Sequence, residues 1–455
     1  MRQINIKTMV NEAKLSTFHY RILLVCALII AFDGYDLTVS GVALPWIMKE
    51  MAINATYAGV LISSALVGMM VGNIVFGTVA DKIGRQKIIV LCILLCSVFT
   101  AAAGFCKEPV SFSAARFIAG LGLGGAMPNV VSLMTEYSPV RIRNALVTSV
   151  FSGFSLGGLL AAGLGKGLIE SYGWQSVFIA AAAPVLLIPM IWKSTPESIP
   201  FLIRGGRIDE LKKIASRVDG QYRPNSDDRF VENHLEAASE APVRQLFQQE
   251  RGLSTLMFWM ACFICLFTVY GLSSWLIKLM AGAGYSNASA LTFMVVMNLG
   301  GVCGVLIGGV LADRLGIKCV LMGMFVLAAV SIILLGVRAP TILVYVWIAI
   351  AGACTIGTQN LINAYAGQFY PIHIRTTGVG WVLGVGRAGA ILSPVAIGML
   401  VHMGLSREQY FLAIGIPSFA AAIAITLIDN IRSDLPAPDG NANLSDERAV
   451  VRAQT

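Results

Sequence analysis

Twelve long apolar runs constrain this chain more than any other feature of its sequence. They lie at residues 20–47, 55–80, 87–105, 109–134, 144–169, 174–193, 253–280, 286–311, 317–337, 341–366, 377–402 and 409–428. A helix needs about 20 mostly apolar residues to cross a bilayer, whereas the strands of an outer-membrane barrel alternate in polarity. Since each run is continuous, we predict an all-α integral membrane protein with twelve transmembrane helices.

Charged residues are few and stand mostly at the ends of these runs. Only 13% of the residues are charged, and the net charge is +8. Lys and Arg gather in alternate short loops, for example at Lys82, Arg141 and Arg314. Basic short loops face the cytoplasm, so we expect both termini there and the chain in the plasma membrane, the inner membrane of a bacterium. The charge forms no stripe that would indicate nucleic acid as a partner.

An internal repeat appears when the chain is shifted over itself by 232 residues. "GTVADKIGR" (77–85) then falls on "GVLADRLGI" (309–317), and "EYSPVRIR" (136–143) falls on "QFYPIHIR" (368–375). Two matches at one offset predict two pseudo-symmetric six-helix bundles in parallel orientation. Such halves commonly enclose a binding site near the midplane of the bilayer and rock around it.

The domain organisation follows from this repeat. We expect a first bundle at 1–193, a cytoplasmic interdomain loop at 194–252, a second bundle at 253–432 and a disordered cytoplasmic tail at 433–455. Within the interdomain loop, "RIDELKKIASR" has the pattern of a short amphipathic surface helix.

The repeat also sorts the charged residues. Charges that recur in both halves, such as Asp81 with Asp313 and Arg143 with Arg375, should serve the shared architecture at the cytoplasmic helix ends. We therefore predict a gating set. It comprises Asp81, Arg85, Glu136, Arg141, Arg143, Asp313, Arg314 and Arg375. Within it we expect Glu136 to pair with Arg141 or Arg143.

Four charges within the spans have no counterpart in the other half. Asp33, Asp36, Arg116 and Arg387 align with Cys265, Thr268, Ile348 and Ser155. Lipid cannot solvate such charges, so they should face the interior of the bundle. At about 1.5 Å per residue, Asp36 and Arg116 lie at similar depth, and Arg387 lies near the middle of its span. This asymmetry favours a role with the ligand.

Several motifs resemble those of a known family. "GTVADKIGR" (77–85) and "RFIAGLGLGGAMPN" (116–129) resemble signatures of the major facilitator superfamily. "FDGYDLTVSGVALP" (32–45), "GVGRAGAILSP" (384–394) and "PES" (196–198) are similar to motifs of its aromatic acid:proton symporter family. The second-half loop "DRLGIK" departs from the pattern, since it lacks the Arg that follows Gly84. Glu136 resembles a position that members of this family need for transport.

This resemblance implies the major facilitator fold and the import of an aromatic carboxylate, of the benzoate or hydroxybenzoate type, by proton symport with alternating access. An aromatic acid is an anion at neutral pH and needs a permanent cation in a dry cavity. We expect Arg387 to be this cation, with Arg116 second, and Asp33 and Asp36 to carry protons. Further candidates for contact with the substrate are Tyr35, Tyr270, Trp275, Asn298, Gln359, Asn360 and Trp381.

We expect no metal or other cofactor, because no Cys/His spacing resembles a zinc site and the proton gradient would supply the energy. The expected partners are the aromatic acid anion, protons and the lipid bilayer, with no obligate protein partner. Two alternatives stay open at this point. One is a proton-coupled carrier of another organic anion, such as a muconate-like dicarboxylate, and the other is a transporter-like nutrient sensor. An efflux antiporter or a membrane enzyme fits the sequence less well.

Overall fold

The computed structural model describes residues 2–218, 222–225, 228–231, 243–248, 250–370 and 374–429. Within these ranges, twelve helical segments are long and apolar enough to cross a membrane, which confirms the predicted number. In the first bundle they are α2 (Thr17–Glu50), α3 (Ala55–Ile83), α4 (Arg85–Ala103), α5 (Pro109–Tyr137), α6 (Arg143–Tyr172) and the pair α7 (Gln175–Ala180) and α8 (Ala183–Ser194). In the second they are α11 (Gly252–Gly282), α12 (Asn287–Leu315), α13 (Ile317–Leu334), α14 (Thr341–Phe369), α15 (Arg375–His402) and α16 (Arg407–Leu427). The predicted tail at 433–455 lies outside the described residues.

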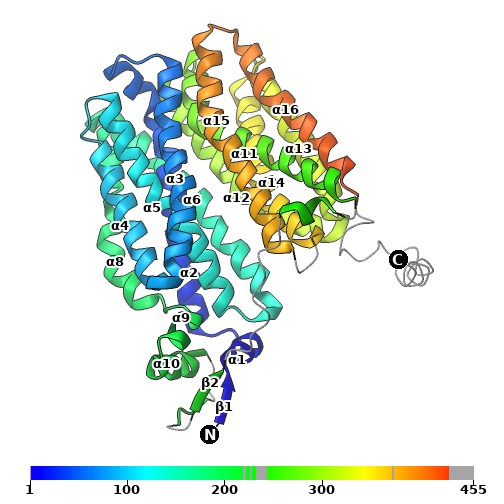
Figure 1. Cartoon of the computed structure of the whole chain (residues 1–455). Coiled ribbons are helices and arrows are strands. Elements are labelled where there is room, and N and C mark those ends of the chain that lie inside the picture. Colours follow the sequence, from blue (N-terminus) through cyan, green and yellow to red (C-terminus); the bar gives the residue numbers. More distant parts are fainter. Residues whose placement is uncertain are drawn as a thin grey trace, which may run out of the picture.

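The packing of the helices repeats in the two bundles (Figure 1). In the first bundle α3 packs on α5, α2 on α6, and α4 on α5. In the second bundle the corresponding pairs are α12 on α14, α11 on α15, and α13 on α14. The internal repeat of the sequence is therefore a repeat of helix packing, as predicted.

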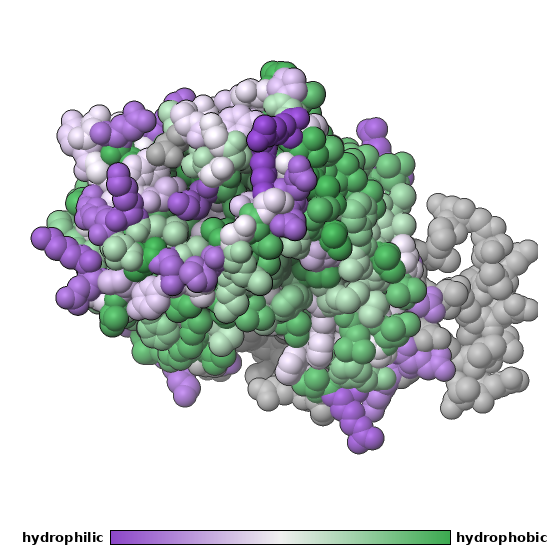
Figure 2. All heavy atoms as spheres, turned by 90° about the horizontal axis from the view of Figure 1, so that it is seen from above, coloured by the Kyte–Doolittle hydropathy of each residue, from purple (hydrophilic) through white to green (hydrophobic). Residues whose placement is uncertain are grey.

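Apolar side chains cover much of the outer surface, as expected for helices that face lipid. Large exposed side chains such as Leu24, Leu186 and Leu306 lie within the spans rather than at their ends. Figure 2 looks at the bundle end-on and shows hydrophobic residues along its flanks, with hydrophilic residues gathered over part of the end. The molecule is thus a multi-pass membrane protein.

The sixth span is two helices rather than the single one predicted. It breaks at Ala181 and Ala182, between α7 and α8. Pro184 follows at once; it has no backbone N–H, and its ring would clash with the carbonyl four residues earlier. The break therefore has a local cause in the sequence.

A small cap lies outside the membrane spans at the end where the chain begins. It consists of β1 (Arg2–Asn5), α1 (Ile6–Glu12), α9 (Ile199–Arg204), α10 (Ile208–Val218) and β2 (Asp228–Val231). The two strands pair in parallel, which the sequence did not predict, whereas α10 is the amphipathic helix that it did. Ile6 and Val10 of α1 join Leu211 and Ile214 of α10 in one apolar cluster with the first bundle. We call the end that carries this cap the N-terminal side and the other end the far side. Two short 3-10 helices, η1 (Val140–Ile142) and η2 (Val243–Phe247), also lie on the N-terminal side.

The two bundles meet through the far-side halves of their helices. A Cβ atom at Gly41 of α2 would overlap the carbonyl oxygen of Ser273 in α11, and one at Gly59 of α3 would overlap that of Pro394 in α15. Small residues let helix backbones approach this closely. The Ser63 hydroxyl also donates to the carbonyl of Ile391 over 2.7 Å. These contacts close the far side of the molecule.

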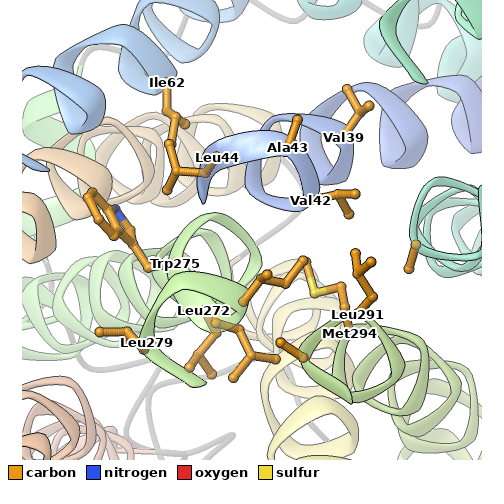
Figure 3. Packing of buried hydrophobic residues seen from close by; sticks show 14 of the residues in the cluster. Val39, Val42, Ala43, Leu44, Ile62, Leu272, Trp275, Leu279, Leu291 and Met294 are labelled. Atoms are coloured by element: carbon orange, nitrogen blue, oxygen red, sulfur yellow. The ribbon is translucent and has the colours of Figure 1, made fainter. Parts of the chain in front are cut away.

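Apolar packing reinforces this closure (Figure 3). Val42 and Leu44 of α2 face Leu272 and Trp275 of α11 in a cluster that draws on both bundles. Hydrophobic side chains alone do not drive helices together in lipid, but close packing between them does stabilise the contact. The far-side interface is therefore a dry, well-packed surface rather than a polar one.

Candidate functional site

A buried ion pair joins α2 to α5. The Arg116 guanidinium binds both carboxylate oxygens of Asp36, at 2.6 Å (Nη1 to Oδ1) and 2.7 Å (Nη2 to Oδ2). Both residues are about 1% exposed. A forked, charge-assisted contact of this kind is among the strongest polar contacts in proteins. The sequence placed the two at similar depth, and the structure shows them in direct contact.

Neighbouring groups complete this pair. The hydroxyl of Thr100, from α4, donates to Asp36 and lies 3.2 Å from the Arg116 guanidinium. Nη2 of Arg116 also donates to the backbone carbonyl of Asp36 over 3.2 Å. The ring of Phe178, from α7, lies 5.9 Å from the centre of the guanidinium. The charge of Arg116 is therefore matched by a carboxylate, and little of it is left for a substrate anion.

Asp33 lies one turn earlier on α2 and is buried in a different way. It is 4% exposed, and its Oδ1 atom has no hydrogen-bond partner among the described residues. Arg387 is close enough to interact with it electrostatically. A buried carboxyl group without a hydrogen-bonded partner is costly unless a proton or a ligand neutralises it. Asp33 therefore has a carboxylate oxygen without a partner, whereas Arg116 binds both carboxylate oxygens of Asp36.

Arg387 is half-buried near the middle of α15. Its Nη1 atom lies 3.4 Å from the hydroxyl oxygen of Tyr270 on α11, and its Nη2 atom lies 3.4 Å from the Sδ atom of Met127 on α5. Among the described residues no carboxylate forms an ion pair with it. The guanidinium thus reaches from the second bundle to the first and keeps its charge available for an anion.

Three of the aromatic candidates for contact with the substrate are bound to partners other than Arg387. Tyr35 donates to the backbone carbonyl of Val177 over 2.6 Å, and Trp275 donates to that of Pro394 over 3.0 Å. Trp381 is 42% exposed and stacks on Trp259 with 5.5 Å between the ring centres. These three aromatic rings pack the bundles in this structure, and Tyr270 is the candidate ring that contacts Arg387.

The polar candidates on α12 and α14 form no hydrogen bond to either aspartate among the described residues. Asn298 is buried and donates to the carbonyl of Met294, one turn earlier in its own helix, over 2.9 Å. Asn360 lies 3.4 Å from the carbonyl of Ile356 in the same way. Gln359 is half-buried and makes no hydrogen bond among the described residues. Its amide is the one of the three that is free to reach a ligand.

The predicted gate is partly assembled, with one different partner. Glu136 forms an ion pair with Arg85, at the start of α4, and not with Arg141 or Arg143 as expected. Its carboxylate also accepts hydrogen bonds from the Ser198 hydroxyl and the Ile199 backbone N–H, both at 3.3 Å. The prediction was wrong because folding brings the start of α4, with Arg85, to the end of α5.

The remaining gating candidates behave differently from one another. Arg143 donates to Asn11 of α1 over 2.6 Å and to the carbonyl of Ser138 over 3.1 Å. Arg141, Asp313 and Arg314 are exposed, without an ion pair among the described residues. The side chains of Asp81 and Arg375 lie outside what the structure describes.

Sequence reasoning missed three neighbours of the charged groups. Thr100, Phe178 and Met127 each contact an arginine within the spans. Nothing in the sequence singles them out, because one hydroxyl, one phenyl ring or one thioether in an apolar helix is common. Across the described part of the chain, no group of three or more His, Cys, Asp or Glu side chains is placed to hold a metal ion.

Comparisons with known proteins identify the family of this chain. The family model described as Major Facilitator Superfamily matches residues 26–394 and 299–452. The chain is 42% identical to a benzoate transport protein of Acinetobacter baylyi, over 96% of this chain and 95% of that one. It is 32% identical to a gallate transporter of Pseudomonas putida, over 93% and 94%.

A solved structure supports the same fold. The crystal structure of a D-xylose–proton symporter has a TM-score of 0.71 at 17% identity, and the match covers 90% of this chain and 98% of that one. The chain belongs to the Major Facilitator Superfamily of membrane transporters. It is a transporter and not an enzyme.

Proposed function

We propose that this protein imports an aromatic carboxylate, of the benzoate or hydroxybenzoate type, by proton symport. Relatives that share nearly its whole length carry the names of benzoate and gallate transporters. The observation that carries the proposal is the half-buried Arg387, which has no carboxylate partner among the described residues and lies within electrostatic range of Asp33, whose Oδ1 atom has no hydrogen-bond partner. A guanidinium binds a carboxylate with two parallel hydrogen bonds and stays charged at every relevant pH.

The proposed site combines an anion anchor with a proton carrier. The substrate carboxylate binds Arg387, and its ring lies near Tyr270. Asp33 takes up a proton before the anion enters, since two carboxylates beside one guanidinium would leave an unpaired charge in a dry site. Proton entry and anion entry are thereby coupled. Asp36, whose carboxylate is already bound by Arg116, is a second carrier that would act only when that pair opens.

Orientation and conformation belong to the same proposal. The basic short loops support a cytoplasmic N-terminal side and insertion into the inner membrane of a bacterium. The closed far side, with its contacts at Gly41, Gly59 and the apolar cluster, supports an inward-facing state as part of this proposal. Substrate leaves from this state, and the outward-facing state requires the far-side contacts to separate.

Uptake by the purified protein in liposomes tests the proposal. A panel of labelled benzoate, 4-hydroxybenzoate, protocatechuate and gallate is offered with and without an inward pH gradient. We expect accumulation of at least one aromatic acid above its equilibrium level only with the gradient. Accumulation that ignores the gradient would remove proton symport, and failure of every aromatic acid would remove the substrate class.

A further inference from the structure

A cavity lies on the N-terminal side, away from the charged residues of the spans. Its volume is about 710 Å³, and its walls come from the start of α2, the start of α4, the end of α8 and one face of α10. Ligand pockets in proteins commonly span about 300–1,000 Å³, so this one has room for a small polar group. The transport mechanism uses none of its lining residues.

The cavity is rich in positive charge. Four of its lining residues are Arg21 of α2, Lys193 of α8, and Lys213 and Arg217 of α10. Among the described residues, the side chains of these four form neither an ion pair nor a hydrogen bond. Four cations around one hollow repel each other unless an anion lies between them. The cavity is therefore complementary to a negatively charged ligand.

The two acids in the wall offset only a small part of this positive charge. Glu210 is paired instead with Arg207, which donates three hydrogen bonds of 2.6–2.8 Å to its carboxylate. Glu197 accepts hydrogen bonds from the backbone N–H groups of Gln86 at 3.2 Å and Ser198 at 2.9 Å. Glu197 keeps its negative charge, because neutral N–H donors do not cancel it, but this one carboxylate against four cations leaves the hollow with an excess of positive charge.

Its position links the cavity to the bilayer. Thr17 is the first residue of α2, and Trp192 lies at the end of α8; both line the cavity at the level where these helices leave the apolar zone. Tryptophan is enriched at the membrane–water interface. Farther along the same two helices, Leu24 is 68% exposed and Leu186 is 81% exposed. At about 1.5 Å per residue, these side chains lie roughly 9–10 Å deeper, where acyl chains would contact them.

We propose that this cavity binds the phosphate headgroup of an anionic phospholipid, with the acyl chains running along α2 and α8. The lining cations bind the phosphodiester, and Trp192 lies at the level of the lipid glycerol. Basic hollows at the ends of membrane helices suit such headgroups. A soluble phosphate would be held by the same cations but would gain nothing from the exposed leucines. The lipid therefore connects α10 of the cap to the membrane spans.

Lipid binding to the full-length protein tests the proposal. The protein is exchanged into a mild detergent, and phosphatidylglycerol, phosphatidylcholine or inorganic phosphate is titrated while native mass spectrometry records the bound species. We expect phosphatidylglycerol to bind in preference to the other two. The variant Lys193→Gln/Lys213→Gln should weaken this binding about thirtyfold, the equivalent of about 2 kcal/mol for two cations near a membrane surface.

Two controls separate a specific site from general charge. Lys212→Gln removes a cation next to Lys213 that does not line the cavity, and it should bind as the unmodified protein does. Lys193→Arg/Lys213→Arg keeps the charge and should keep most of the binding, which excludes misfolding as the cause of a loss. Equal binding by the glutamine variant, or equal binding of phosphatidylcholine, would overturn the proposal. Displacement of the lipid by millimolar inorganic phosphate would show that the site takes soluble phosphate instead.

Discussion

At the scale of single residues, the two arginines within the spans differ in what remains for them to bind. Arg116 is saturated by the carboxylate of Asp36, whereas Arg387 contacts a hydroxyl and a thioether. From the sequence we expected Arg387 to be the anchor for an anion and Arg116 the second candidate, but each is one cation in an apolar helix and its partners are not visible there. The structure separates them because it shows which one already has a counter-ion.

Replacement of Arg387 should abolish uptake. We expect Arg387→Ala to lower the initial rate of aromatic acid uptake more than a hundredfold, and Arg387→Lys to retain a small part, because lysine cannot form the forked contact with a carboxylate. Initial rates in liposomes measure this. The control Arg338→Ala removes an exposed arginine outside the spans and should transport normally. Unchanged uptake by Arg387→Ala would contradict the anchor role.

Replacement of Asp33 should separate the proton from the substrate. In Asp33→Asn the side chain is always neutral, so the anion can still bind Arg387 but no proton accompanies it. We expect exchange of labelled for unlabelled substrate across the membrane to persist, while accumulation driven by a pH gradient is lost. Asp33→Asn protein that accumulates substrate as well as the unmodified protein would exclude this residue as the carrier.

The effects of replacing Asp36 and Arg116 on the stability of the protein should depend strongly on each other. Removal of one partner leaves an uncompensated buried charge and costs about 3–5 kcal/mol, whereas removal of both can be nearly neutral. We expect Arg116→Met alone to lower the melting temperature in detergent much more than Arg116→Met/Asp36→Leu does. A double variant that is as unstable as the sum of the single variants would show that the pair contributes no specific stability.

At the scale of helices, the sequence predicted the spans well and the contacts between helix ends poorly. Each span is a continuous apolar run, and lipid tolerates little else, so the twelve helices were visible directly. The repeat also predicted which helices correspond. The break before Pro184 was missed because the apolar run at 174–193 continues across this residue, and membrane helices tolerate proline within them. The pair of Arg85 and Glu136 was missed because it joins the start of α4 to the end of α5, 51 residues apart in the sequence.

Two glycines of α2 and α3 should control closure of the far side. A valine at Gly41 or Gly59 would overlap backbone of the second bundle, so the far side could not close as it does here. We expect Gly41→Val and Gly59→Val to fold but to favour the state with the far side open. Spin labels at Glu108→Cys and Ala283→Cys, with Cys303 and Cys319 replaced by serine, should move apart. Gly163→Ala, where a Cβ meets nothing within 4 Å, is the matched control. An unchanged label distance in both valine variants would refute this role.

At the scale of the whole molecule, orientation in the membrane is the property that the sequence addresses and the fold does not. The twelve helices would pack in the same way with either end facing the cytoplasm, and only the distribution of Lys and Arg distinguishes the two orientations. The repeat shows why both halves share this distribution, since Lys82 and Arg314 occupy equivalent positions.

Reporter fusions should reveal the orientation. Alkaline phosphatase is active only outside the cytoplasm, so a fusion after Glu108, in a far-side loop, should be active in cells. A fusion after Arg141, in a loop on the N-terminal side, should be inactive. The reverse pattern would place the cap outside the cell and would invert the proposed direction of opening.

The cap at the start of the chain has a practical consequence. Its strand β1 is paired with β2, and α1 packs on α10 and reaches Arg143 at the base of α6. A fluorophore attached near residue 2 would therefore move rigidly with the first bundle and would not move independently of it. With an acceptor dye on the second bundle, the efficiency of energy transfer between the two dyes would change each time the bundles move during a transport cycle.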